Sequence, residues 1–390
     1  MSSTPHVTVV GAGLAGLAAA VTAAERGAPV VVHEAHRTVG GRARTAQVPY
    51  RTNDGPHALY RKGPHFAWLK ERGLLEPIAV LPLKEGARLR FHRKGSLRRT
   101  PPPGLLRLVV RRAERAPVDQ DFHTWASGLV GPANARAAAH FAAVALFHHD
   151  PGALSAAFVQ ERLRRAAAVP PEARYPVGGW GPLAERMAAY ARRLGVRIET
   201  GSRVDPLPVD EGPVVVATAL PAAARLLGDA SLTGVSGRTV LLDLGLRAER
   251  GDLFAVSDLD APGWIERFTA QDPALAPRGA SLLQGQVPIA PHESKADGVA
   301  RAERLLDLGF PGWRERTTHR AEALSDGRTG ALDLPGTTWR DRPAVDRGDG
   351  VFLAGDQVAA PGVLSEVSFA SGVRAGRLAA ERALAARTAA

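Results

Sequence analysis

Three glycines and one glutamate near the start of the chain have the types and spacing needed to hold a nucleotide. Gly11, Gly13 and Gly16 form a G-x-G-x-x-G pattern, and Glu34 follows 23 residues after Gly11. The first glycine permits a tight turn, the second lets the backbone approach a pyrophosphate, and the third allows close packing of a helix. A carboxylate at this spacing accepts hydrogen bonds from ribose hydroxyls and disfavours a 2′-phosphate.

The segments around these residues must position them, and their order is strand, turn, helix and strand. Val7–Val10 is a short apolar strand, and the alanine-rich stretch from Leu14 to Arg26 reads as a helix that Gly27 ends. Val30–His33 is a second strand, with Glu34 at its end. The start of the helix presents free N–H groups and partial positive charge to phosphates. A dinucleotide-binding unit is therefore expected, since all of its parts occur in sequence.

A second glycine pair follows directly and bears on which dinucleotide is bound. Val39-Gly40-Gly41-Arg42 allows another close backbone approach, and its arginine can pair with phosphate oxygens. The stretch EAHRTVGGRART resembles the superfamily of FAD-binding amine oxidases, protoporphyrinogen oxidases and phytoene desaturases, and is most similar to phytoene-dehydrogenase-related proteins. The resemblance implies that the cofactor is FAD and that Gly40, Gly41 and Arg42 lie against its pyrophosphate.

The carboxyl-terminal stretch GVFLAGDQVAAPGVLSEVSFASG resembles the flavin motif of the same superfamily. Val351–Ala354 reads as an apolar strand, and a helix is expected from about Ser365 to Ala386. The resemblance implies that Asp356 holds a ribityl hydroxyl and that the backbone of 362–364 lies beside the pyrimidine edge of the flavin. A helix amino terminus at that edge would stabilise the negative charge of reduced flavin.

Two further segments resemble the superfamily. NDGPHALYRKG, residues 53–63, corresponds to a Gly-Pro-His segment that passes near the isoalloxazine, and Gly55 and Pro56 fix a turn there. His57 is the candidate catalytic residue because its ordinary pKa lies near neutrality. A structural histidine that hydrogen-bonds its own loop is an equally open reading. In the segment 174–207, the resemblance places the backbone of Val204 beside adenine.

Taken together, the candidate contacts all concern one FAD molecule. The predicted cofactor-binding residues are Gly11, Gly13, Leu14, Ala15, Gly16, Glu34, Ala35, Gly40, Gly41, Arg42, Gly55, Pro56, Val204, Gly355, Asp356, Gly362, Val363 and Leu364. No metal ligand is predicted, because histidines such as His148 and His149 lack a convincing partner spacing.

The predicted fold is α/β, with a Rossmann-like FAD-binding domain of the glutathione-reductase-2 type and an inserted α+β substrate domain. The first domain takes residues 1–60, 171–229 and 346–390, and the insert takes 61–170 and 230–345. The 390 residues exceed the usual size of one domain. In the insert, the chain is helix-rich after Pro103, and strands are expected at Thr239–Leu246 and Ala280–Val287.

Composition and charge limit the kinds of partner and the cellular location that can be expected. The net charge is +11 and 45 of the 50 basic residues are arginine, but no nucleic-acid-binding motif accompanies them. There is no cysteine, and the uncharged run from Val7 to Ala24 is broken by glycines, so a cytoplasmic protein without a membrane span is expected. The basic stretch from Lys84 to Arg115 reads either as a peripheral membrane contact or, preferably, as a helix of the insert with solvated arginines. The sequence leaves the oligomeric state open.

The function expected from these features is an FAD-dependent oxidoreductase. It would take a hydride onto flavin N5 from a largely apolar organic substrate, isoprenoid-like or a secondary metabolite, in a desaturation or oxidation. An amine or porphyrinogen oxidase is the alternative enzyme. A non-catalytic protein of the same fold that binds prenyl groups or lipids is the alternative of another class. The electron acceptor stays open.

Overall fold

A parallel sheet assembled from distant parts of the chain forms the first of two bodies in this computed structural model, which describes residues 6–47, 49–110 and 114–389. Its strand order is β15-β9-β1-β2-β8, and all four pairings are parallel. The strands are β1 (Val7–Val10), β2 (Val30–Glu34), β8 (Arg197–Thr200), β9 (Val214–Val216) and β15 (Val351–Leu353). Because parallel strands end at one edge, the loops after β1, β2, β9 and β15 meet there.

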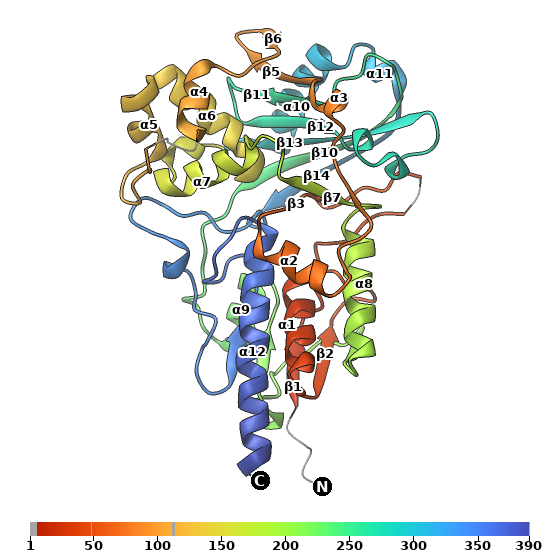
Figure 1. Cartoon of the computed structure of the whole chain (residues 1–390), viewed down its shortest axis with the longest axis vertical. Coiled ribbons are helices and arrows are strands. Elements are labelled where there is room, and N and C mark those ends of the chain that lie inside the picture. Colours follow the sequence, from red (N-terminus) through yellow and green to blue (C-terminus); the bar gives the residue numbers. More distant parts are fainter. Residues whose placement is uncertain (1–5, 48, 111–113, 390) are drawn as a thin grey trace.

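Long helices cover this sheet and lie side by side in the lower body (Figure 1). They are α1 (Leu14–Glu25), α8 (Trp180–Arg193) and α12 (Ser365–Ala389), while α9 (Leu220–Leu227) follows β9 and α2 (Pro64–Glu71) packs against α12. A Cβ atom at Gly372 or Gly376 of α12 would overlap backbone atoms of α1. The two helices therefore pack at backbone distance, which fixes α12 against the glycine turn.

The second body contains a seven-stranded sheet of order β14-β10-β13-β12-β11-β5-β6. Its strands are β5 (Leu89–Arg93), β6 (Ser96–Arg98), β10 (Arg238–Arg247), β11 (Ala255–Asp258), β12 (Gly263–Arg267), β13 (Ala280–Pro288) and β14 (Thr317–Asp326). Alternate residues serve opposite faces. Val256 and Ile265 pack under α10 (Lys295–Gly309), whereas Ala255 and Trp264 join a helical core on the other face.

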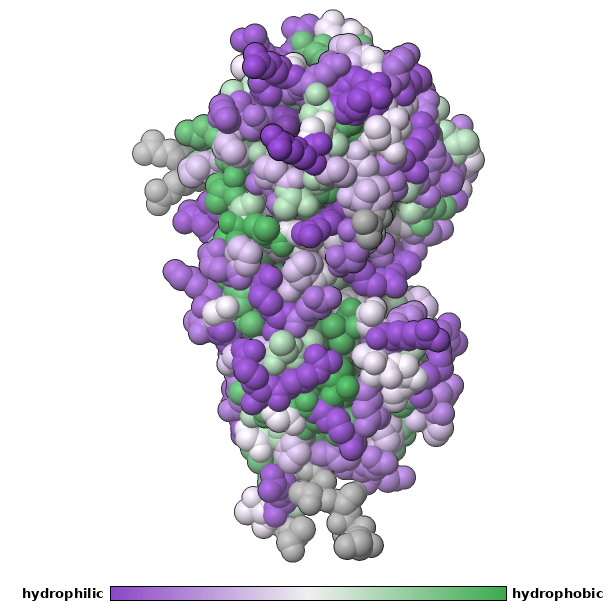
Figure 2. Space-filling view, turned by 90° about the vertical axis from the view of Figure 1, so that its right-hand side faces the viewer, coloured by the Kyte–Doolittle hydropathy of each residue, from purple (hydrophilic) through white to green (hydrophobic). Residues whose placement is uncertain are grey.

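That helical core comes from the first half of the chain. Its helices are α4 (Pro103–Val109), α5 (Phe122–Val130), α6 (Pro132–Ala142) and α7 (Ala156–Ala166). A separate three-stranded sheet has the order β3 (Leu59–Tyr60), β7 (Ala173–Pro176) and β4 (Ile78–Ala79). Two further short helices are α3 (Leu83–Gly86) and α11 (Trp313–Arg316). The molecular surface narrows between the bodies, and the side chains on the face shown are mostly hydrophilic (Figure 2).

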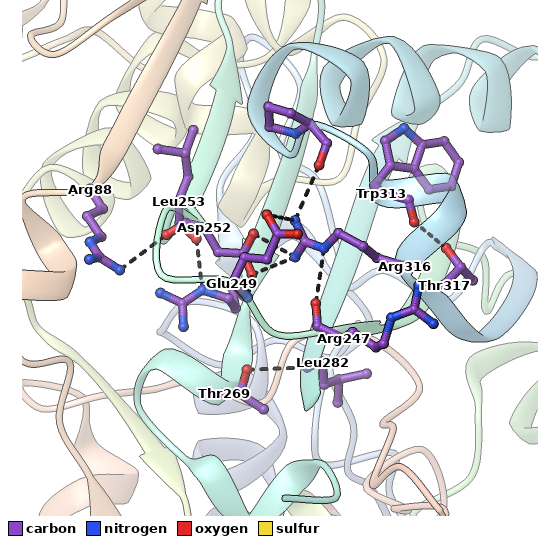
Figure 3. A network of polar contacts seen from close by, with 12 residues as sticks. Arg88, Arg247, Glu249, Asp252, Leu253, Thr269, Leu282, Trp313, Arg316 and Thr317 are labelled. Carbon is purple, nitrogen blue, oxygen red and sulfur yellow. Dashed lines mark hydrogen bonds and ion pairs between the residues drawn. The ribbon is translucent and has the colours of Figure 1, made fainter. Parts of the chain in front are cut away.

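A buried ion pair fastens α11 to the seven-stranded sheet (Figure 3). Arg316, 5% exposed, donates from Nη2 to both carboxylate oxygens of Asp252 at 2.7 Å. Its Nε donates to the carbonyl oxygen of Arg247 at 3.0 Å, and Glu249 lies 3.2 Å from its Nη1. One guanidinium thus joins the end of β10, the loop before β11 and the start of β14.

The predicted α/β fold with an inserted α+β body is confirmed, but one predicted boundary needs correction. Leu69, Leu74 and Leu75 lie in the core of the first body, together with residues of α1 and α12. The chain therefore crosses into the second body after residue 75 rather than at residue 61. The reason is that α2 has its apolar face against α12, which a motif search cannot detect.

The basic stretch predicted at 84–115 contributes α4 to the helical core. Leu105 and Leu108 are buried there, while Leu106 and Arg107 face outwards. Residues 111–113 of this stretch lie outside the described residues. Among the helices that the structure describes, none is at once long enough and apolar enough to cross a membrane.

Candidate active site

A cavity of about 620 Å³ runs from the glycine turn of the first body to the sheet of the second. Gly13 from the amino-terminal motif, Asp356 from the carboxyl-terminal motif and Leu241 of β10 all line it. The volume lies within the range of ligand cavities in proteins. Segments at opposite ends of the chain therefore form one continuous wall.

The glycine turn is shaped for a close ligand. Gly11 has φ +106°, and a Cβ there would lie 2.8 Å from the Ala217 carbonyl oxygen. A Cβ at Gly16 would overlap the Gly11 carbonyl oxygen, so this glycine serves helix packing. Gly13 differs, because its Cβ would meet nothing nearer than the Gly40 carbonyl oxygen at 3.9 Å. The space beside Gly13, at the amino terminus of α1, is therefore open to a phosphate group.

Glu34 is fixed at the wall of the cavity by two backbone groups. Its Oε2 accepts a hydrogen bond from Ala12 N at 2.8 Å, and its Oε1 accepts one from His36 N at 2.9 Å. Each carboxylate oxygen keeps capacity for a further donor. The carbonyl oxygen of Glu34 accepts from Ser202 N at 2.9 Å, which brings the cavity-lining Val204 to the same end. This end can hold a ribose and its base.

The second glycine pair packs on the first turn. Gly40 and Gly41 have φ +109° and +58°, and a Cβ at Gly41 would lie 3.3 Å from Gly13 Cα. Arg42 follows and reaches across the cavity wall to Asp356, with Nη1–Oδ2 at 2.8 Å and Nη2–Oδ1 at 2.7 Å. Asp356 is the main cause of the raised pKa of Arg42. The structure thus joins two predicted cofactor contacts that are 314 residues apart.

The far end of the cavity lies between the two bodies. Gly55, Pro56 and Trp180 line one part of it, and Leu364 and Ser368 line another. The indole Nε1 of Trp180 donates to the Pro56 carbonyl oxygen at 3.1 Å, so α8 holds the turn in place. Leu364 has φ +55°, an uncommon conformation for a residue with a side chain. Such a conformation at a cavity wall is typical of a functional site.

His57 does not line the cavity. It is fully buried, its Nδ1 accepts a hydrogen bond from Asn53 Nδ2 at 3.2 Å, and its ring lies 4.7 Å from that of Phe268. Burial lowers its pKa to about 3, so it is neutral at pH 7. The structure therefore supports the structural reading of His57 rather than the catalytic one. The turn at Gly55 lines the cavity, whereas the ring of His57 is buried against Phe268.

The other predicted contacts divide between the wall and its support. Those on the wall are Gly11, Gly13, Leu14, Ala15, Glu34, Ala35, Gly40, Gly41, Arg42, Gly55, Pro56, Val204, Gly355, Asp356 and Leu364. Gly16, Gly362 and Val363 lie behind it, and Val363 N donates to Glu366 Oε2 at 3.0 Å instead of facing the cavity. The carboxyl-terminal loop thus presents Leu364 alone among its three predicted residues, because Gly362 and Val363 fold back over Glu366.

Several wall residues carried no sequence signal. They are Phe147, Trp180, Thr239, Leu241, Ser325 and Thr329. The alternation of side chains along β10 predicts that Thr239 and Leu241 lie on one face of the strand. It does not predict which face of the strand meets the first body. A separate cluster of His92, Asp258 and Asp260 could in principle hold a metal, yet Asp258 Oδ1 already accepts from His92 Nδ1, Asp260 N and Ala261 N. We assign no metal to it.

Comparisons with known proteins agree with this geometry. Residues 9–72 match the model of an NAD(P)-binding Rossmann-like domain. No curated protein matches the sequence. Three solved structures with the same fold are an oxidoreductase from Methanosarcina mazei, a cyclohexylamine oxidase from Brevibacterium oxydans and a putrescine oxidase.

The likeness to these structures extends over nearly the whole chain. For the Methanosarcina protein the identity is 19%, the TM-score 0.73, and the match covers 95% of this chain and 99% of that one. For the cyclohexylamine oxidase the values are 18%, 0.68, 99% and 99%, and for the putrescine oxidase 16%, 0.67, 98% and 99%. The chain therefore has the fold that these three solved oxidoreductases share. Its closeness to phytoene-dehydrogenase-related proteins stays a prediction.

Proposed function

We propose that this protein is an FAD-dependent oxidoreductase that holds FAD noncovalently in the cavity between its two bodies. One observation carries the proposal: a single cavity joins the Gly13 turn and Glu34 to Asp356, and then continues to a chamber beneath the second sheet. The residues present suit an elongated dinucleotide, because Gly13 leaves room for phosphate and Glu34 has lone pairs for ribose. When bound, FAD supplies a hydride acceptor at flavin N5.

The chain's own residues bind and orient the cofactor. The amino terminus of α1 attracts the pyrophosphate, and Gly41 permits its close approach. Arg42 and Asp356 stand beside this path, so each can exchange part of their mutual ion pair for a phosphate oxygen or a ribityl hydroxyl. The chamber beyond them, between Pro56 and Leu364, is left for the flavin ring.

The wall of that chamber is mixed in character. Phe147, Trp180 and Leu241 give it apolar surface that excludes water and suits a largely apolar substrate. Thr239 and Ser325, which are register partners on β10 and β14, add hydroxyls at one edge. We therefore infer an isoprenoid-like or secondary-metabolite substrate that loses a hydride to give a C=C or C=N bond.

An amine or porphyrinogen oxidase is the second candidate. The likeness to a cyclohexylamine oxidase and a putrescine oxidase favours it. We expect a C–N oxidase to have an aromatic cage over the flavin. Among the described residues that line the cavity, the large aromatic side chains are Phe147 and Trp180. This composition favours the first candidate.

The experiment is spectroscopic. Purified protein should be yellow, with flavin absorbance, and anaerobic addition of candidate substrates should bleach it with one chemical class only. Bleaching by amines alone would select the amine oxidase. A colourless protein that takes up no FAD from solution would overturn the proposal and favour the non-catalytic binder of prenyl groups or lipids.

A further inference from the structure

A buried ion pair supports the loop before α12 from behind. Glu366, in the first turn of α12, is 1% exposed, and its Oε1 accepts a hydrogen bond from Arg165 Nη2 at 2.6 Å. Its Oε2 accepts from Val363 N at 3.0 Å. Arg165 belongs to α7 of the second body, and its Nε also donates to Glu172 Oε2 at 2.8 Å. A charge from the helical core of one body thus neutralises a carboxylate at the helix terminus of the other.

The same helix makes a second contact with this loop. Arg162, 4% exposed and one turn before Arg165, donates from Nη2 to the Gly362 carbonyl oxygen at 3.2 Å. Its guanidinium carbon lies 3.4 Å from the centre of the Phe158 ring, and its Nη1 pairs with Glu161 at 3.0 Å. Two arginines of α7 therefore hold the loop, one by a carbonyl group and one through Glu366.

Packing leaves Glu366 little freedom to move. A Cβ at Gly63 would overlap the Glu366 carboxylate, and a Cβ at Gly362 would lie 2.5 Å from the Cβ of Glu366. His65 Nδ1 is 4.0 Å from Glu366 Oε1. Burial and then the charge of Arg165 lower the pKa of His65 to about 3, so this ring contributes no charge at neutral pH. The charged side chains that contact the loop are therefore Glu366, its partner Arg165, and Arg162, which is paired with Glu161.

The other side of this loop is the cavity. Leu364, Ser365 and Ser368 line the wall there, where α12 begins. The nucleotide end of the cavity is at Gly13 and Glu34, so this end faces the flavin ring if FAD is bound as proposed. Reduction adds negative charge to that ring, and buried charges interact with it more strongly than charges in water do, because the protein interior has a low dielectric constant.

We propose that Arg165 and Glu366 are positioning residues through which the second body tunes the reduction potential of the bound flavin. The inference rests on the proposed function, since it requires FAD in the cavity. Glu366 alone would disfavour the reduced, more negative ring, and Arg165 alone would favour it. Their pairing balances the two effects while holding the loop at the wall.

The test uses the two partners separately in the FAD-loaded protein. Glu366→Gln removes the negative charge, so reduced FAD should bind about tenfold more tightly relative to oxidised FAD, which is about 30 mV for two electrons. Arg165→Met should shift the midpoint potential by a similar amount in the opposite direction, measured at pH 8.5 to keep Glu366 ionised. The double variant should return close to the wild-type potential.

The controls separate charge from structure. Arg165→Lys keeps the charge and should keep the wild-type potential, even where Arg165→Met folds poorly. Asp252→Asn changes the buried pair in Figure 3, away from the cavity, and should lower stability without moving the potential. Shifts in the same direction from Glu366→Gln and Arg165→Met, or no shift in either, overturn the inference while the proposed function stands. A wild-type protein that binds no FAD overturns both.

Discussion

At the scale of single residues, Gly13 and Gly16 show how one motif contains two different tasks. A Cβ at Gly16 would overlap backbone of the first turn, whereas a Cβ at Gly13 would point into open space beside Gly40. Gly16 is therefore required by the fold, whereas at Gly13 the fold leaves room that a ligand can use. This difference gives a direct probe of cofactor binding.

Gly13→Ala should keep the fold and bind FAD more weakly. A methyl group in the phosphate space costs about 1–3 kcal/mol, which weakens binding about 5- to 150-fold. Gly16→Ala should instead lower the free energy of unfolding even without FAD, because the helix must move away from the turn. Fluorescence titration with FAD and denaturant unfolding of the FAD-free proteins measure the two effects. An unchanged FAD affinity in Gly13→Ala would contradict the assignment of the cavity.

The buried histidines make stability depend on pH. His57 has a pKa of about 3 in the folded protein, and about 6.5 is expected once unfolding exposes it. Between these pH values the unfolded chain binds a proton that the folded protein does not. Stability therefore falls as the pH is lowered from 6.5 towards 3, by about 1.4 kcal/mol per pH unit for this residue.

His57→Gln should remove that part of the slope and keep a side chain that can bond to Asn53. The comparison is the free energy of unfolding at pH 6.5 and 4.5 for both proteins, by denaturant titration. Burial lowers the pKa of His65 to about 3 and raises that of Asp243 to about 6. Both groups are present in both proteins, so their contributions to the pH dependence cancel in the comparison. Parallel pH profiles would show that His57 is accessible to protons in the folded state.

At the scale of elements, each of the two bodies is stabilised internally by a different kind of contact. Helices α1 and α12 pack at backbone distance through Gly372 and Gly376, so the first body depends on shape. The second body uses buried charge, with Arg316 tying α11 to β10 and to Asp252 (Figure 3). A buried pair contributes little net stability when intact, but removing one partner leaves the other charge unpaired.

Arg316→Met should therefore cost about 3–5 kcal/mol of unfolding free energy. Arg314 lies two residues before Arg316 and forms an exposed pair with Asp307, so Arg314→Met should change stability very little. Urea unfolding of both variants tests the difference. Because a methionine fits near the same volume, Asp252→Leu in the Arg316→Met background should recover much of the loss. Equal effects of the two arginine variants would contradict this account of the pair.

At the scale of the whole molecule, the cavity wall comes from both termini and from the second sheet. Gly13 and Leu364 belong to the first body, and Phe147 and Leu241 to the second. A ligand that touches both bodies stabilises both when it binds the folded state alone. The two bodies should consequently respond together to FAD.

Adding FAD at 100 times its dissociation constant should raise the unfolding free energy by about 2.7 kcal/mol. Hydrogen exchange should show the protection in β10 as well as in β1, because both lie behind the wall. The matched control is Gly13→Ala, in which the same FAD concentration should give much less protection. Protection confined to the first body would contradict a shared cavity.

The sequence determined the local geometry of the two terminal motifs. The turn at Gly11, the start of α1 and the acid at the end of β2 follow from residues that are neighbours along the chain. Backbone conformation and helix ends depend on such neighbours, so Glu34, Gly41 and Asp356 could be predicted as cavity residues from their motifs. The family resemblance supplied the prediction that the cofactor is FAD.

The tertiary structure decided which side of each segment meets the cavity. His57 and Gly55 are two residues apart, yet Gly55 lines the cavity and the ring of His57 packs against Phe268. The pairing of Arg165 with Glu366 joins residues 201 apart that have no shared motif. Burial, pKa and long-range ion pairs arise only when separate elements pack together, so no pattern within one segment can contain them.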